Sequence, residues 1–239
     1  MKTKAFGPGW VPTIAALIAL SLTLSAAYWQ YGRAQYKIEL REQYMARLAM
    51  PPLRLNDAIP PPEMASFRKV QVSGEYVPEK AILLDNKVSE GAPGYEIVAP
   101  LRISGSDRFV LIDRGWASRG RDRSDQPVIR LPQGIVMVTG TAVLPGRGAL
   151  ELSNVVVEGR VWQNLNLARF RDLQHLDVLG FIVQEQSGED DGLKRNWPQP
   201  GFGIEMHESY TGQWLLFSAL IIFLYVYYGF LKKRTGDKK

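Results

Sequence analysis

The chain has no cysteine and only two histidines, and both shortages restrict its chemistry. Without cysteine there is no disulfide, thiolate metal site, CxxC redox pair or covalent c-type haem attachment. A metal or haem would have to bind through histidine, methionine, tyrosine or carboxylates. Copper delivery by this chain alone is also not expected, because Cu(I) sites prefer sulfur.

Common catalytic motifs are missing as well: GxSxG, Walker A, HExxH and the Rossmann glycine pattern do not occur. In the pairs Asp113-Arg114 and Asp122-Arg123, the adjoining arginine is expected to keep each carboxylate ionised and lower its pKa. A general acid needs the opposite. The sequence therefore predicts a protein that is not an enzyme, although a Ser–Lys pair stays open. No basic patch interleaved with aromatics is present, so nucleic acid is not an expected partner.

Charge is absent from two long runs near the ends, residues 10–29 (WVPTIAALIALSLTLSAAYW) and 211–231 (TGQWLLFSALIIFLYVYYGFL). A bilayer core about 30 Å thick needs about 20 apolar residues in a helix. Helix is also the conformation that satisfies the backbone of an isolated span in lipid. The sequence therefore predicts transmembrane helices over residues 10–30 and 211–231, with the lipid bilayer as a partner.

The first run has a second interpretation, because Ser25, Ala26 and Ala27 resemble a signal-peptidase site. The run is longer than a typical signal-peptide core, and Tyr28 and Trp29 follow it as interfacial aromatics would. These features favour an uncleaved anchor.

Basic residues predict the orientation. Lysines and arginines at 232–234 and 238–239 follow the second run and place the C-terminus in the cytoplasm. Two spans put both termini on one side, so residues 1–9 and the basic tail 232–239 are expected inside and the middle segment outside. The charged N-terminal stub is too short for an organelle transit peptide, which favours a bacterial inner (cytoplasmic) membrane.

The middle segment changes character along its length. Residues 31–50 continue a helical pattern that prolines 51 and 52 end, and residues 51–66 form a proline-rich loop. Residues 67–186 read as a β-rich domain, followed by a polar linker at 187–210. Val70 and Val72 alternate with polar residues in the first apolar run of this domain, residues 68–77. Together with the later short runs, it predicts strands at residues 68–77, 81–85, 95–103, 109–116, 135–144, 152–162 and 178–186.

One short helix is expected at residues 166–176, with Leu167, Phe170 and Leu173 on one face. The expected fold class is therefore an α+β membrane protein. Two terminal transmembrane helices flank a β-rich extracytoplasmic domain, either an antiparallel sheet or a small barrel, that contains this helix.

His207 is the main candidate for binding a cofactor. It lies just before the second uncharged run, and neutral imidazole is the commonest axial ligand of haem iron. Tyr210 and Trp214 are one helical turn apart and could line a flat apolar ligand. The alternative is an interfacial histidine that is hydrogen-bonded to headgroups or to the domain. His175, in a polar stretch, is expected to be solvated.

The motif RGW, residues 114–116, ends a predicted strand and is a candidate for partner contact, since arginines beside an exposed aromatic often bind partners. A core tryptophan with solvated arginines is the alternative.

Several further segments carry a resemblance when taken in order. They are WQYGRAQYK (29–37), GEY (74–76), LLDNKVSEGAPGYEIVAPL (83–101), VLIDRGW (110–116), VTGTAVLPGR (138–147) and HESYTGQW (207–214). With this order and spacing between two terminal spans, the chain resembles the surfeit locus protein 1 family, the assembly factors of cytochrome c oxidase. It departs from that family at Ala117-Ser118, where Val-Pro is usual, and at residues 199–206, where the family has an Asn-rich stretch.

The resemblance implies a non-catalytic membrane factor that helps insert haem a into the catalytic subunit of a haem–copper oxidase, or stabilises that subunit. Transient haem a is the implied cofactor, with His207 as iron ligand beside Tyr210 and Trp214. Haem a synthesis proteins and other oxidase assembly proteins are further implied partners. The implied partner-contact residues are Trp29, Gln30, Arg33, Arg114, Gly115, Trp116 and Gln213.

Three alternatives stay open at this point. The chain could be a haem-free chaperone in which His207 is structural, a scaffold for another respiratory membrane protein, or an anchored extracytoplasmic enzyme.

Overall fold

The computed structural model describes residues 8–120, 126–145, 157–188, 191–197 and 201–231. The chain forms two compact units: a helical unit from residues 1–43 and 200–239, and a β domain from residues 44–199. Three predicted features lie outside the described residues. They are nearly all of the two predicted cytoplasmic tails, the pair Asp122-Arg123, and the first half of the predicted strand 152–162.

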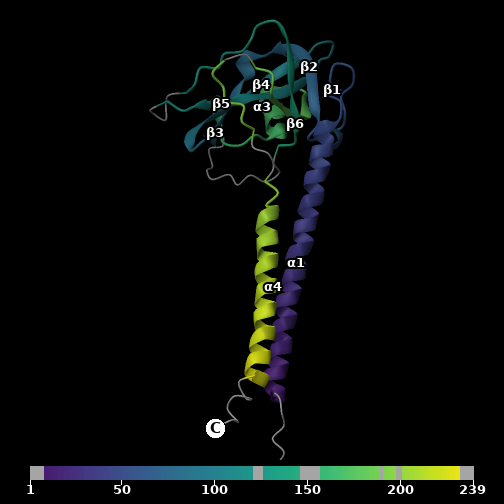
Figure 1. Cartoon of the computed structure of the whole chain (residues 1–239). Coiled ribbons are helices and arrows are strands. Elements are labelled where there is room, and N and C mark those ends of the chain that lie inside the picture. Colours follow the sequence, from purple (N-terminus) through teal and green to yellow (C-terminus); the bar gives the residue numbers. More distant parts are fainter. Residues whose placement is uncertain (1–7, 121–125, 146–156, 189–190, 198–200, 232–239) are drawn as a thin grey trace, which may run out of the picture. The chain divides into compact units, whose positions relative to one another are not determined.

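The two uncharged runs form helices α1 (Trp10–Ala49) and α4 (Ile204–Val226), which lie side by side in Figure 1. Both are long and apolar enough to cross a membrane. Helix α1 joins the predicted span and its extension without a break. Helix α4 begins at Ile204 rather than Thr211, so the end of the predicted linker is helical. Gly203 precedes it in a left-handed conformation that glycine adopts readily.

Polar side chains join the two helices at separate levels. The hydroxyls of Thr13 and Tyr225 are 2.8 Å apart, and Ser218 Oγ donates to Thr23 Oγ1 at 2.8 Å. As the residue number increases along α1, the number of the contacting residue in α4 decreases, so the two helices are antiparallel. The more buried positions of α4 recur every three or four residues, a coiled-coil spacing. They are Ile204, His207, Thr211, Trp214, Ser218, Ile221 and Tyr225.

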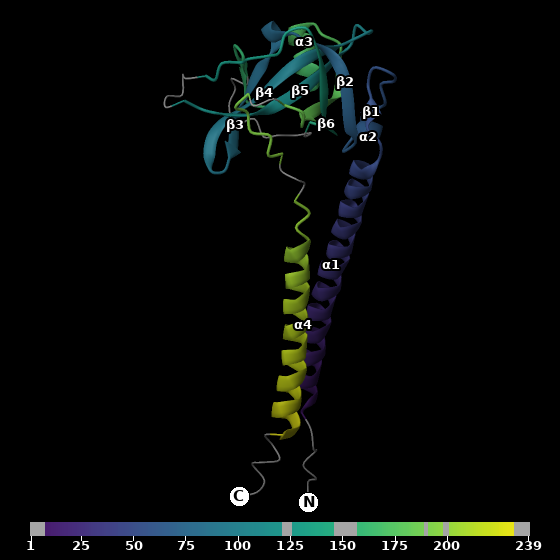
Figure 2. The ribbon, with the colours of Figure 1, turned by 45° about the horizontal axis from the view of Figure 1, so that its top comes forward.

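Five strands of the β domain close into a barrel, part of which is visible in Figure 2. The order around the ring is β2-β6-β9-β5-β4, and pairing of β4 with β2 completes it. The barrel strands are β2 (Lys69–Tyr76), β4 (Ala92–Ile103), β5 (Phe109–Ser118), β6 (Ile135–Val143) and β9 (Val178–Glu185). The remaining strands are β1 (Leu53–Arg54), β3 (Ile82–Ser89), β7 (Val157–Glu158) and β8 (Val161–Trp162).

Of the two expected sheet types, the barrel is the one formed, but it is not purely antiparallel. Strands β5 and β9 run parallel, with Leu111 opposite Ile182. The chain reaches β9 only after β7, β8 and helix α3 (Leu167–Gln174). Such a crossover lets a strand enter in the same direction as its neighbour.

Alternation along the strands separates the two largest core clusters. All five barrel strands contribute to the interior cluster, which includes Val72, Leu101, Ile112, Val138 and Phe181. The opposite faces of β3, β4, β5 and β9 pack against Trp162 and Phe170 instead.

Helix α3 confirms the predicted helix and one of its contacts, and corrects another. The Asn166 side chain caps its first turn by accepting from Arg169 N, and Phe170 is fully buried. Leu173 was expected on the same face but is 53% exposed. Leu167, at the start of the helix, and Leu176, just after its end, also pack against the cluster around Phe170.

The two segments expected to be irregular are partly folded onto the β domain. The proline-rich loop contains β1, parallel to β2, and helix α2 (Pro62–Ala65). In the polar segment after β9, Trp197 Nε1 donates to Glu185 O at 2.8 Å. The linker is therefore packed on the barrel as far as Trp197.

Candidate functional site

In the helical unit, His207 is paired with Gln30 of α1. His207 Nδ1 lies 2.7 Å from Gln30 Oε1, and the ring is partly buried. An amide oxygen can only accept, so Nδ1 must carry the proton. In a neutral imidazole with this tautomer, Nε2 has the free lone pair through which histidine binds a metal. A hydrogen bond at the other ring nitrogen is the usual support of a metal-binding histidine.

The aromatic residues near His207 differ in their surroundings. Trp214 lies on the same face of α4 and packs edge-on against Phe217, with ring centroids 5.7 Å apart. Tyr210 is 45% exposed. A planar group beside His207 would thus meet one packed and one exposed ring.

The remaining candidates of the helical unit lie on its surface. Trp29 is exposed, and the Arg33 guanidinium sits 5.8 Å from the centre of its ring. Gln213 is exposed and lies outside the inner face of α4. All three are open to a partner, whereas Gln30 is engaged by His207.

In the β domain, Arg114 forms a buried ion-pair cluster. Its Nε donates to Glu185 at 3.1 Å and its Nη2 to Asp191 at 2.8 Å, while Nη1 donates to Arg130 O at 2.8 Å. Arg195 contacts the same two carboxylates at 3.3 and 2.6 Å. The Arg114 side chain is only 4% exposed, so it is not the solvated arginine of the alternative interpretation.

Gly115 and Trp116 contact residues 191–197, the segment after β9 that also contains Asp191 and Arg195. Trp116 and Lys194 exchange backbone hydrogen bonds of 2.8 and 2.9 Å. Gly115 has φ +138°, and a Cβ there would lie 2.9 Å from Lys194 O, so glycine is required. Trp116 is 8% exposed, and its Nε1 donates to Lys87 O. The RGW residues are therefore buried in the domain. A partner at this surface would contact residues 191–197 instead.

Charge and burial act in opposite directions in this cluster. Burial raises the pKa of Glu185, although Arg114 and Arg195 partly offset it. Burial also opposes ionisation of Asp191, but hydrogen bonds from Arg195 and from the Leu193 backbone outweigh it and lower the pKa. Removing either arginine would leave a carboxylate without compensation.

The pKa of Asp113 is shifted in the direction opposite to the one predicted from its neighbour Arg114. Burial, and next the charge of Glu96, raise the pKa of Asp113 well above its ordinary value, opposed only by Lys87 and the Gly115 backbone. Adjacent residues of a strand point to opposite faces, so Arg114 turns away from the carboxyl beside it in sequence. Asp113 Oδ1 makes no hydrogen bond within the described part of the chain.

A pH-dependent stability follows from Asp113. Because its folded-state pKa is raised, its stabilising contribution is complete below the unfolded pKa of about 3.9 and is lost as pH rises through the folded pKa. We expect Asp113→Asn to remove that loss. The stability gained over the wild type should grow as the pH is raised above about 4. Urea unfolding of the solubilised chain over a pH series measures this, with the exposed Asp57→Asn as control. A constant or shrinking gain would contradict the assignment.

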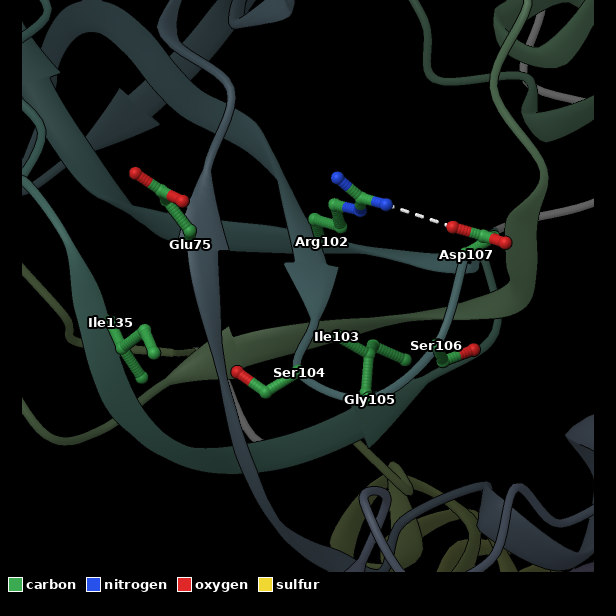
Figure 3. Close-up of a pocket in the computed structure, with 8 residues that line it drawn as sticks. All are labelled: Glu75, Arg102, Ile103, Ser104, Gly105, Ser106, Asp107 and Ile135. Atoms are coloured by element: carbon green, nitrogen blue, oxygen red, sulfur yellow. Dashed lines mark hydrogen bonds and ion pairs between the residues drawn. The ribbon is translucent and has the colours of Figure 1, made fainter.

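Other concave regions are less suited to chemistry. A surface hollow of about 460 Å³ is lined by Arg102, Asp107 and Ile135 among others, and Arg102 pairs with Asp107 at 2.8 Å. Figure 3 shows this pair, with Ile135 set apart from it. The side chain of Asp107 is 96% exposed, so the ion pair is solvated. Among the described residues, no three His, Asp or Glu side chains gather as a metal site.

Sequence reasoning missed the partners of the candidate residues. It selected Gln30 and His207 separately, but not their contact, and it did not select Glu185, Asp191 or Arg195. Gln30 and His207 lie 177 residues apart in sequence, and no local pattern marks the pair. The carboxylate partners lie 71 and 77 residues from Arg114, and no local pattern marks them.

Comparison with known proteins gives consistent matches. The model of the SURF1 family matches residues 17–219. An uncharacterized SURF1-like protein of Mycobacterium tuberculosis is 30% identical over 139 residues, which cover 55% of this chain and 51% of that protein. A SURF1-like protein of Rickettsia felis is 29% identical over 110 residues, covering 44% and 46%.

A eukaryotic relative carries a functional name. The cytochrome oxidase assembly protein SHY1 of Saccharomyces cerevisiae is 26% identical over 142 residues, covering 56% of this chain and 36% of that protein. The matches span about half the length of the mycobacterial relatives. The family match runs from within α1 to within α4 and takes in the whole β domain. The chain belongs to the SURF1 family.

Proposed function

We propose that this chain is a non-catalytic assembly factor for a haem–copper (cytochrome c) oxidase. The observation that carries the proposal is family membership together with similarity to the yeast oxidase assembly protein. The RGW residues hold the domain together, which gives them a structural rather than a catalytic role. Asp113, whose pKa is raised as a general acid would need, is 2% exposed and out of reach of a substrate.

Both long helices are proposed to span a bacterial inner membrane. Their outward faces carry large apolar side chains that would be unfavourable in water but suit lipid. These include Leu17, Ile18, Leu22, Leu216, Phe217 and Phe223. The basic residues after α4 put both termini in the cytoplasm and the β domain outside it.

The proposed cargo is haem a, held transiently. His207 fits an axial ligand, because Gln30 fixes the proton on Nδ1 and leaves Nε2 available to the iron. Tyr210 and Trp214 supply apolar surface beside it. Haem a provides the redox centre of the recipient oxidase, so this chain only has to hold and release it. A single imidazole ligand suits release better than a pair would.

Protein contacts are proposed for the catalytic subunit of the oxidase. Trp29, Arg33 and Gln213 are exposed on the helical unit and would dock on it. Haem a synthesis proteins and other assembly proteins are further proposed partners. A haem-free chaperone that makes the same contacts is the second candidate, and the histidine–glutamine pair favours the haem-binding form over it.

Purification of the full-length chain tests these roles together. The tagged protein is expressed in cells that make haem a, extracted in mild detergent and compared with His207→Ala. Haem a absorbance in the wild type and its loss in the variant would support the cargo proposal. Recovery of the oxidase catalytic subunit without haem would overturn that proposal and leave a chaperone. Recovery of neither haem nor oxidase would contradict the assembly role.

A further inference from the structure

Strand β6 keeps one partner along its length and loses the other halfway. Strand β2 pairs with it from Ile135 to Thr141. On the other side, β9 pairs only with residues 140–143. Within the described residues, no strand pairs with residues 135–138 on that side. The barrel wall is therefore open there.

The direction of the backbone groups follows from their hydrogen bonds. Ala142 N donates to Arg68 O, so Ala142 faces the β2 side. Thr139 O accepts from the backbone of Gln186 and Ser187, so Thr139 faces the other side. Backbone direction alternates along a strand. The N–H and C=O groups of Ile135 and Met137 therefore point into the opening, as those of Thr139 do.

The side chains on this half-strand are apolar and exposed. Ile135 is 75% exposed and Met137 is 61% exposed. Proteins normally protect such edges with charges, proline or a covering element. An unprotected apolar edge beside unpaired backbone groups is suited to accept another strand.

A cavity of about 470 Å³ adjoins the open edge. Met137, Leu131, Tyr76, Arg114 and Glu185 contribute to its lining. Tyr76 is only 5% exposed, and its hydroxyl donates to no acceptor in the described structure, because the Arg114 guanidinium beside it can only donate. Burial raises the pKa of Tyr76 strongly, so the hydroxyl keeps its proton. The cavity thus offers a buried donor that needs an acceptor.

The charges around the cavity indicate which side chain would enter it. The buried charges are balanced, because Arg114 and Arg195 are matched by Glu185 and Asp191, while Arg130, which also lines the cavity, is exposed to solvent. An incoming charge would be unpaired there, and its desolvation would be unfavourable. A neutral side chain with an acceptor oxygen, such as Asn, Gln, Ser or Thr, meets the Tyr76 hydroxyl without disturbing this balance.

We propose that the open half of β6 binds an extended peptide segment of a partner protein as an added strand. One residue of the segment turns a neutral acceptor side chain inward to the Tyr76 hydroxyl, and its neighbours in the segment turn outward beside Ile135 and Met137. Only a peptide backbone offers donors and acceptors at the two-residue spacing of this edge, about 6.7 Å. This surface goes beyond the oxidase role and does not depend on it.

The test uses phage-displayed random linear peptides, selected on the full-length chain in detergent. We expect selected peptides to slow hydrogen exchange at the Ile135 and Met137 amides, with little change at Val136 and Val138, which already face β2. Met137→Pro removes the outward N–H and leaves the β2 pairing intact, and should weaken binding about tenfold. Tyr76→Phe removes only the hydroxyl, and should weaken binding severalfold.

Three results would overturn this proposal: no selected peptide, protection at other strands, or affinity unchanged in both variants. Tyr76→Phe keeps the test valid if Met137→Pro fails to fold. Because no oxidase or haem takes part, failure of this test leaves the assembly role standing.

Discussion

Replacing Arg114 with alanine is expected to lower the free energy of unfolding of the β domain by about 3–5 kcal/mol. The substitution leaves Glu185 and Asp191 in a buried site with only Arg195 to compensate them. It also removes the donor to Arg130 O. The segments that contain Arg130 and Asp191 therefore both lose their hydrogen bonds to the Arg114 side chain.

Denaturant unfolding followed by hydrogen exchange in β5 and β9 measures this effect separately from the helices. The matched control is Arg102→Ala, because Arg102 pairs with Asp107 in solvent and should contribute less than about 1 kcal/mol. In the Arg114 variant, the amides of Trp116 and Lys194 should also lose protection. Equal small losses in both variants would show that the buried cluster does not hold the domain.

Replacing Gln30 with leucine is expected to weaken haem a binding by about 10- to 100-fold, the usual effect of losing the partner of a metal-ligating histidine. Without the acceptor at Nδ1, the His207 ring loses its fixed orientation and its Nε2 becomes less basic. Gln30→Glu keeps an acceptor oxygen and should retain most of the affinity.

Absorbance titration of the solubilised chain with haem a provides the measurement. Gln213→Leu is the matched control, since it makes the same change on the exposed surface of α4. Its affinity should equal that of the wild type. If the two leucine variants bind equally well, Gln30 does not position His207.

Local patterns predicted the elements well. Uncharged runs of membrane length became α1 and α4, and the alternation around Val70 and Val72 became β2 with both valines buried. These signals depend only on near neighbours in sequence. Helix α4 begins at Ile204, before the uncharged run, because the polar residues that precede Thr211 are also helical and no apolar pattern marks them.

Long-range geometry was beyond such patterns. Closure of the barrel by β2 and β4, and the parallel entry of β9, depend on register between distant segments. The same limit explains the error at Asp113. Its neighbour in sequence is Arg114, but strand geometry separates the two side chains, and the carboxyl lies closer to the charge of Glu96.

The proposed role in the assembly of a haem–copper oxidase can be tested in the cell. The most direct experiment deletes its gene in a host with such an oxidase and measures cytochrome c oxidation and haem a absorbance in isolated membranes. We expect both to fall and the wild-type gene to restore both. Unchanged oxidase activity and unchanged haem a in the deletion strain would contradict the assembly role.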